Sequence, residues 1–495
     1  EKLATDYIIK QFQGIGLSPK GLNGGYLQPF EINEGKQIQK GSHFLINQNE
    51  LVAGNDFFPL AYSPNSASIE AVVSPSLAES GLPWFKDIGD ILINNRDNPH
   101  FDLQSQLRNE IKNAKEKGAR AIVFHNSSGI NDGIKFDEKD KSEQAEIPVF
   151  YLRQAAREKY MEDPAGSYDI RLKSELGPKT RQANNVAAYI DNGASSTIIL
   201  GAHFDHLGYG EDGNSMIRTG DKLIHNGADD NASGTAALIE LGRLLKKSKS
   251  KKSNYLLLAF SGEELGLYGS KYYVENPTIS LSDVNYMINM DMVGRLNDSS
   301  KTITVGGFGT SPAWNEIIFG TKKPPFNIKI DSSGTGPSDH TSFYRKDLPV
   351  LFFFTGLHTD YHKPGDDAEK INYTGELRII QFIQSIVEKS HSNGKLAFTK
   401  TREQQMGTSA RFSVSMGIMP DYTFSGSGVK VDGVSDGRPA QKAGIKTGDV
   451  VIQLGQYKVY SVESYMQVLS KFKNGDSTKV TVKRGNEELT FNIVF

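Results

Sequence analysis

The chain has 495 residues, too many for one ordinary domain, so we expect two to four domains. Its 56 Lys and Arg residues almost balance its 58 Asp and Glu residues, which gives no net charge that would favour nucleic acid or an anionic membrane. The absence of cysteine excludes disulfides and thiolate metal ligands, and no apolar run approaches the about 20 residues of a membrane span. We therefore expect a multidomain protein with neither a nucleic-acid partner nor a membrane span.

The first 170 residues change character at about residue 45. An amphipathic helix is expected within residues 1–30, in the segment LATDYIIKQFQGIGL. From residue 45 to 170, strand-like runs such as IEAVV and IPVFYL surround one helical stretch, LRNEIKNAKEKGA. We therefore expect residues 1–44 to begin one domain and residues 45–170 to form a β-rich insert.

Residues 171–393 alternate apolar strand patterns with helices. TIILGAH, YLLLAF, NYMINM and LPVLFFF are the apolar runs, and GELRIIQFIQSIVEKS is the last helix pattern. This alternation predicts an α/β domain with a mixed, mostly parallel sheet flanked by helices. Residues 394–407 are polar and are expected to be a linker. Residues 408–495 contain short strands and one helix, Ser461 to Phe472, which predicts a β-rich terminal domain.

Potential metal ligands follow the apolar strands of residues 171–393. In an open α/β sheet, ligands bind beyond the carboxyl ends of the strands. The polar residues at those ends, or at the start of the helix pattern DDNASGTAALIELGRLL, are His203, Asp205, Asp229, Glu263, Glu264, Asp291, His358 and His362. Each one alone is typical of a helix cap, a turn or a structural hydrogen bond. Together they favour a metal site, because oxygen and nitrogen donors suit Zn²⁺ where thiolates are absent.

Two adjacent aspartates, Asp229 and Asp230, stand at the start of that helix pattern. One aspartate is enough to cap a helix and to complement its dipole. A second carboxylate that points inward needs a cation nearby. The pair therefore indicates a role beyond capping.

The order and spacing of six motifs resemble the dinuclear-zinc aminopeptidase family, which includes leucyl aminopeptidases, aminopeptidase Y, glutamate carboxypeptidase and the glutaminyl cyclases. The motifs are GAHFDHLG, GADDNASGTA, FSGEELGLYGS, INMDMVGR, SDHTSF and YHKPGDD. The resemblance covers residues 1–40 and 180–392, and it implies the zinc exopeptidase fold.

The resemblance also implies two zinc ions per chain and their ligands. His203 and Asp291 would bind one ion, Glu264 and His362 would bind the other, and Asp229 would bridge both. A cis peptide bond would join Asp229 to the aspartate that follows it.

Catalytic roles follow from the same resemblance. Glu263, next to a ligand but not one itself, would act as the general base and pass the proton to the leaving amine. Asp205 would orient His203. His340, in SDHTSF, would stabilise the oxyanion, and a structural hydrogen bond is the alternative role for this residue. Three further histidines match no ligand position and are expected to be structural or near the site: His206, His225 and His358.

The other two domains resemble known modules. Residues 45–170 resemble a protease-associated domain, which we expect to cover the cleft or to select substrates by size. Residues 408–495 resemble a PDZ domain, in which SMGIMPDY at residues 415–422 fits the carboxylate-binding loop. A PDZ domain binds chain ends at a sheet edge, so a peptide C-terminus is a candidate partner besides the peptide substrates.

Three activities fit this chain: an aminopeptidase, a carboxypeptidase or glutaminyl cyclase on the same metal core, and a receptor-like protein without metals. His203 argues against the cyclases, which lack this histidine in the family, and the filled ligand positions argue against a receptor. A carboxypeptidase would need a basic group near the metals, for which Arg295 is the candidate. Because the chain begins at Glu1 without Met or an apolar leader, we expect a periplasmic or secreted protein whose leader is absent here.

Overall fold

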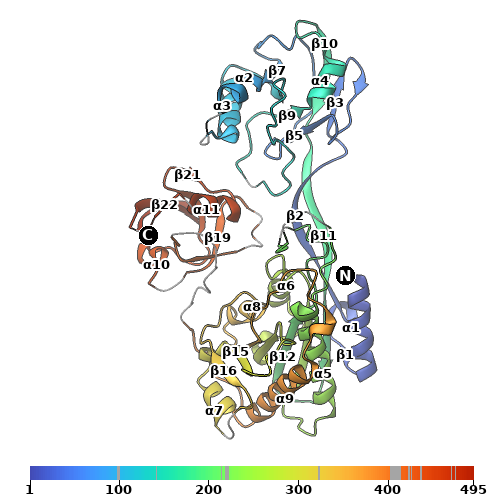
Figure 1. Cartoon of the computed structure of the whole chain (residues 1–495), viewed down its shortest axis with the longest axis vertical. Coiled ribbons are helices and arrows are strands. Elements are labelled where there is room, and N and C mark those ends of the chain that lie inside the picture. The colour runs from blue at the N-terminus through green and yellow to red at the C-terminus, as the bar shows by residue number, and fades with distance from the viewer. Residues whose placement is uncertain are drawn as a thin grey trace.

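The computed structural model describes the whole chain except residues 97, 99–100, 141, 213, 218–221, 321–323, 402–413, 422–423, 425, 435–436, 470 and 474. Three lobes are visible in Figure 1. An insert lies at the top, a sheet covered by helices at the bottom, and a C-terminal domain beside the region between them. In the described part of the chain, no helix is both long enough and apolar enough to cross a membrane.

The lower lobe is built on a mixed sheet that contains nine strands within the described ranges. Its order is β1 (Ser18–Pro19), β11 (Leu176–Ile190), β13 (Asn254–Phe260), β12 (Thr197–His203), β14 (Val284–Met290), β17 (Val350–Phe354), β15 (Thr302–Gly306) and β16 (Asn327–Ile330), and β2 (Leu27–Ile38) pairs with β11. The four strands β13, β12, β14 and β17 are parallel, whereas β11 and β15 join them in antiparallel orientation. The predicted mixed, mostly parallel sheet is confirmed.

Helices cover both faces of this sheet because side chains alternate between the faces along each strand. On β13, Tyr255 and Leu257 belong to one core, and Leu256 and Leu258 belong to the other. The first core is covered by four helices: α1 (Lys2–Ile15), α5 (Gly234–Lys247), α7 (Ala313–Phe319) and α9 (Tyr373–Ser390). The second is covered by α6 (Tyr268–Glu275) and α8 (His340–Tyr344). Fully buried strands explain the uninterrupted apolar runs in the sequence.

The insert is carried by the long antiparallel pair β2 and β11, which runs from the lower lobe to the upper one (Figure 1). One of its sheets contains β3 (His43–Ile46), β4 (Asn49–Glu50), β6 (Ile69–Val73) and β10 (Tyr168–Lys173). The other contains β5 (Phe57–Pro59), β7 (Pro83–Asp87), β8 (Ala121–His125) and β9 (Val149–Leu152). Its helices are α2 (Gly89–Asn94), α3 (Leu103–Glu116) and α4 (Gln154–Tyr160). The predicted boundaries at 45 and 170 fall inside β3 and β10, so the insert extends a few residues further on each side.

The C-terminal domain has a sheet and a core of its own. Its strands are β18 (Ile418–Pro420), β19 (Val429–Val434), β20 (Val450–Leu454), β21 (Tyr457–Lys458), β22 (Ser477–Arg484) and β23 (Glu487–Val494), and its helices are α10 (Pro439–Ala443) and α11 (Val462–Leu469). Met416, Val451 and Val480 are buried in that core. The predicted β-rich terminal domain is confirmed, whereas part of the predicted linker and the start at residue 408 lie outside the described residues.

Candidate metal centre

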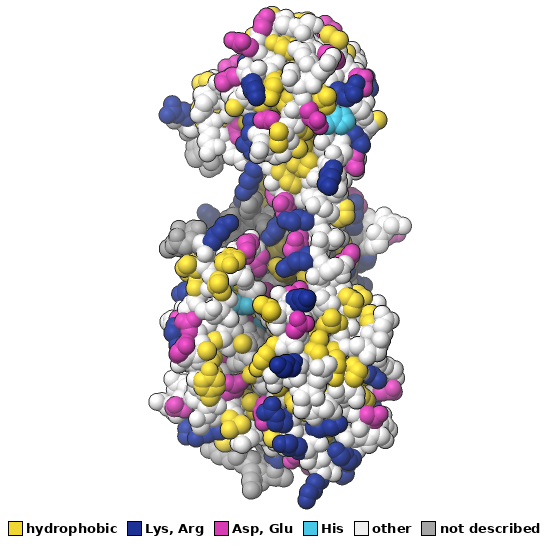
Figure 2. Space-filling model, turned by 90° about the vertical axis from the view of Figure 1, so that its right-hand side faces the viewer, with side chains coloured by type: hydrophobic (Ala, Val, Ile, Leu, Met, Phe, Trp, Pro, Cys, Tyr) yellow, Lys and Arg dark blue, Asp and Glu magenta, His cyan; other side chains and the backbone are white. Residues whose placement is uncertain are grey.

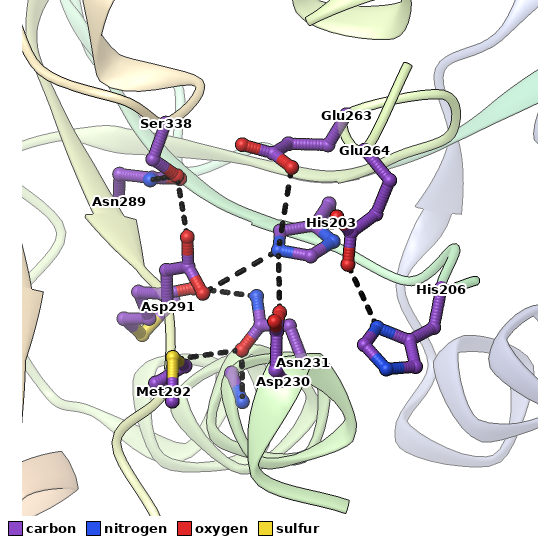
Figure 3. Close-up of polar contacts among 12 residues, drawn as sticks. His203, His206, Asp230, Asn231, Glu263, Glu264, Asn289, Asp291, Met292 and Ser338 are labelled. Atoms are coloured by element: carbon purple, nitrogen blue, oxygen red, sulfur yellow. Dashed lines mark hydrogen bonds and ion pairs between the residues drawn. The ribbon is translucent and has the colours of Figure 1, made fainter. Parts of the chain in front are cut away.

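Three of the predicted ligands, His203, Glu264 and Asp291, come together with Asp230 at the carboxyl edge of the parallel strands (Figure 3). Because β12 and β13 are in register, with His203 opposite Phe260, His203 emerges beside the loop that carries Glu263 and Glu264. Asp291 follows β14 directly. The remaining contributions come from the turn Ala228–Ser233 before α5 and from the loop after β17.

One set of donors surrounds His203, which is 1% exposed. Its Nε2 atom lies 3.4 Å from an oxygen of Asp291, 3.5 Å from an oxygen of Asp230 and 4.0 Å from an oxygen of Glu263. Neither the Nε2 atom of His203 nor the facing oxygen of Asp291 has a hydrogen-bond partner among the described residues. Buried polar atoms without partners are costly, and these two point at the same space.

A second set of donors lies on the other side of Asp230. The Nε2 atom of His362 is 3.3 Å from the second oxygen of Asp230 and 3.2 Å from an oxygen of Glu264. The remaining oxygen of Glu264 is 2.7 Å from Nδ1 of His206. Asp230 therefore directs one carboxylate oxygen toward each set of donors.

Asp229 lies elsewhere, which corrects the predicted ligand by one residue. One oxygen of Asp229 accepts hydrogen bonds from the backbone N–H of Gly294 (2.7 Å) and the hydroxyl of Ser233 (3.0 Å). The other oxygen is 3.2 Å from Nε2 of His358. The cis peptide bond joins Asp230 to Asn231, not Asp229 to Asp230. The sequence does not distinguish Asp229 from Asp230, because their side chains are identical. Only the path of the turn decides which carboxylate faces the donors.

Asp205 holds the loop after β13 more directly than it holds His203. Its carboxylate accepts the backbone N–H groups of Glu263 (3.1 Å) and Glu264 (3.3 Å). The Nδ1 atom of His203 lies 3.2 Å from the carbonyl oxygen of Asp205 but 3.8 Å from its carboxylate. Burial raises the pKa of the Asp205 carboxyl to about 6. The predicted orientation of the imidazole therefore involves the main chain of Asp205.

His340 does not reach the cavity in front of the donors. It is 1% exposed, and its ring stacks on Phe352 with centroids 4.5 Å apart and planes 9° apart. Gly336, which lines the cavity, lies against the ring, since a Cβ atom there would be 2.9 Å from Nε2 of His340. Burial lowers the pKa of His340 to about 3. This geometry disfavours the predicted oxyanion role, and it does not support the alternative hydrogen bond either, because Nδ1 has no hydrogen-bond partner among the described residues and the ring is held by stacking.

The electrostatics of the two sets of donors call for a cation. Burial raises the pKa of Glu263 well above its ordinary value, and burial also raises the pKa of Asp230. Although burial opposes it, hydrogen bonds from His206 and His362 lower the pKa of Glu264 to about 2. Contacts with Asp230 and Glu264 overcome burial and raise the pKa of His362 to about 10. The side chains alone do not balance these buried carboxylates, so the oxygen and nitrogen donors fit divalent zinc.

Residues that support the donors were missed or left without a role at the sequence level. The hydroxyl of Ser338 donates to Asp291 (2.8 Å) and accepts from Asn289 (2.8 Å), as Figure 3 shows. His206, which the sequence placed only near the site, contacts Glu264. No local pattern marks such residues, because their partners are distant in the chain.

In front of the donors lies a cavity of about 1580 Å³. All parts of the molecule contribute to its walls, including Glu263, Glu264 and His362 of the lower lobe, Ser63 and Lys139 of the insert, and Ile418, Phe424 and Val462 of the C-terminal domain. Charged side chains of both signs gather at the waist between the lobes in Figure 2. Across the cavity edge, Lys271 of α6 is 3.0 Å from Asp421, and Arg345 forms an ion pair with Asp432. The C-terminal domain is therefore a wall of the same cavity.

Comparison with known proteins identifies two parts of the chain. The profile of Peptidase family M28 matches residues 185–387, and that of the PDZ domain matches residues 398–494. Aminopeptidase YwaD of Bacillus subtilis is 24% identical over 65% of this chain and 68% of its own length. Leupeptin-inactivating enzyme 1 of Streptomyces exfoliatus is 32% identical over 32% of this chain and 37% of its own length. A solved structure of BSAP, a zinc aminopeptidase from Bacillus subtilis, covers 81% of this chain and 90% of its own at 18% identity and a TM-score of 0.42.

Proposed function

We propose that this chain is a dinuclear-zinc aminopeptidase that removes N-terminal residues from peptides, because the profile of Peptidase family M28 matches residues 185–387 and aminopeptidase YwaD is similar to this chain over 65% of the chain's length. The observation that carries this proposal is the position of Asp230, whose two oxygens face two separate sets of donors. A carboxylate shared in this way suits two neighbouring cations, because each oxygen can serve one of them.

The ligands follow from these contacts. His203 and Asp291 would hold one zinc ion, Glu264 and His362 would hold the other, and Asp230 would bridge them. When bound, zinc supplies Lewis-acid activation of water and polarisation of the scissile carbonyl.

Glu263 is the candidate general base. Its carboxylate is 9% exposed, lines the cavity and lies beside His203, while its backbone N–H is fixed by Asp205. From there it would accept a proton from the attacking water and deliver it to the nitrogen of the leaving amine. Glu263 also lies close enough to His203 and Asp291 to be a third ligand of the same ion. A variant of Glu263 must therefore show whether the residue acts as the base or as a ligand.

The residues around the cavity favour recognition of an N-terminal amine over a C-terminal carboxylate. The two zinc ions would offset the carboxylates of Asp230, Glu264 and Asp291, so a free amine would be recognised by the carboxylate of Glu263 and by coordination to zinc. Arg295, the candidate for a carboxypeptidase, is paired with Asp360 at 2.5 Å, and it is absent from the described residues that line the cavity. This pairing disfavours the carboxypeptidase alternative.

The test combines metal content with the choice of peptide end. Mass spectrometry of the intact protein should find two zinc ions per chain. Peptides with a free N-terminus and an amidated C-terminus should be hydrolysed from the N-terminus. Release of C-terminal residues, or a protein that binds fewer than two zinc ions when zinc is in excess, would contradict the proposal.

A further inference from the structure

A buried polar network lies behind the turn that carries Asp230. Asp366, which is 1% exposed, accepts the backbone N–H groups of Asp229 (2.9 Å) and Asp230 (3.0 Å) with a single carboxylate oxygen. The backbone N–H of Ala228 donates to the carbonyl oxygen of Asp366 (3.0 Å). Three successive residues of the turn are therefore held by one residue from the loop after β17.

His358, from the same loop, contacts the side chain of Asp229. Its Nε2 atom lies 3.2 Å from an oxygen of Asp229, and its Nδ1 atom lies 3.3 Å from a guanidinium nitrogen of Arg295. A guanidinium group only donates, so Nδ1 acts as the acceptor, whereas Nε2 lies near the Asp229 oxygen without a hydrogen bond between them. Arg295 is itself anchored by Asp360 and by the carbonyl oxygen of Lys370 at 3.1 Å.

His358, Ser233 and Gly294 of this network contact the side chain of Asp229, not that of Asp230. Asp229 is fully buried, and its other oxygen is occupied by Gly294 and Ser233. Asp230 can direct one oxygen to each set of donors only while the main chain of the turn keeps its present path. A helix cap would need one of these contacts, whereas the turn has several, from residues distant in the chain.

We propose that Asp366 and His358 are positioning residues, which hold the turn so that Asp230 can serve two zinc ions. This proposal rests on the proposed function, because it concerns the same metal pair. Asp366 fixes the main chain through its accepting oxygen, and His358 packs against the Asp229 side chain. Neither residue is proposed as a ligand, since both lie outside the metal-binding groups found among the described residues.

Zinc binding tests the role of Asp366 without reference to activity. Metal-free protein is titrated with zinc in competition with a chromophoric chelator, which gives the number of ions and their affinities. Asp366→Ala removes the acceptor of two N–H groups and should weaken zinc binding about 10- to 100-fold, the usual effect of losing a residue that supports a ligand. Asp366→Asn keeps an accepting oxygen and should stay within a few-fold of the parent protein.

A matched control is available in the PDZ domain. Asp449 is 1% exposed and accepts the backbone N–H of Lys446, but it lies in a different domain from the metal centre. Asp449→Asn should leave both zinc affinities unchanged. Circular dichroism and the melting temperature of the metal-free forms show whether each variant is folded.

The outcomes separate this proposal from a merely structural role and from the proposed function. A purely structural residue would lower the melting temperature while zinc affinity at 25 °C stayed the same, and that result overturns the proposal. If Asp366→Ala does not fold, His358→Phe makes the same comparison, and parent-like zinc affinity in that variant also overturns it. A parent protein that binds fewer than two zinc ions refutes the proposed function instead.

Discussion

Two regions of the same cavity differ in whether their charged side chains are paired. At the metal centre, buried carboxylates such as Asp230 and Glu263 gather, and no Lys or Arg among the described residues forms an ion pair with them. At the contact with the PDZ domain, Lys271 pairs with Asp421, and Arg345 pairs with Asp432. Unbalanced buried charge requires a cation from solution, whereas balanced charge needs only the partner surface. The charge balance therefore distinguishes the metal centre, where the reaction would occur, from the contact with the PDZ domain.

We expect the largest effect on zinc occupancy and activity from a change at Asp230, because both proposed zinc ions share its carboxylate. Asp230→Ala should lower zinc occupancy at both positions and reduce activity to background, because both ions lose a ligand. Asp449→Asn, in the PDZ domain and away from both sets of donors, is the control and should retain its zinc. Metal content by mass spectrometry checks both variants. Full double occupancy in Asp230→Ala would show that this carboxylate is not the bridge.

If Glu263 is the general base and not a ligand, a variant of this residue should lower kcat without loss of zinc. Glu263→Gln keeps the shape of the side chain, so two zinc ions and the fold should be retained. We expect kcat to fall at least about 100-fold, the lower range for a positioned acid–base group. Loss of zinc in this variant would instead make Glu263 a ligand, and a normal kcat would mean that another residue moves the proton.

Recognition of the N-terminus should also make activity depend on a free α-amine. A free amine would donate a hydrogen bond to Glu263 or coordinate zinc, and N-acetylation removes both interactions. We expect kcat/KM for acetylated peptides to be at least about 10-fold lower, which corresponds to about 1.4 kcal/mol. The comparison uses one peptide with and without the acetyl group. Equal values would indicate cleavage inside the chain or from the C-terminus.

How much of this could be read from the sequence depends on how local each signal is. The sheet followed from apolar runs that are buried on both faces, and four of the five predicted ligands meet at its edge: His203, Glu264, Asp291 and His362. Asp229 was wrong by one residue because the neighbouring side chain is identical and the turn decides which one faces the donors. The roles of Asp366 and Ser338 depend on partners far away in the chain, which no local pattern reports. The periplasmic or secreted location stays a prediction.

We expect the smallest effect on kcat at the contact with the PDZ domain, where the charged side chains are paired. Asp421→Asn combined with Asp432→Asn removes the acidic partners of Lys271 and Arg345 without touching the lower lobe. The four side chains are only 10–23% exposed, so the loss of both acidic partners should cost more than the about 0–1 kcal/mol of a surface pair and should loosen the contact of the PDZ domain with the lower lobe. No predicted ligand or base lies in this domain, so kcat on a small aminoacyl reporter should stay within a few-fold of the parent. KM for longer peptides should rise, because we expect them to contact the PDZ wall of the cavity as well as the metal centre. When this wall moves, the effective concentration of that second contact falls. Glu487→Gln, an exposed change in the same domain, serves as the control. If the double variant stays folded and zinc-loaded but loses activity on the small reporter, the PDZ domain belongs to the catalytic centre and the two regions are not separable.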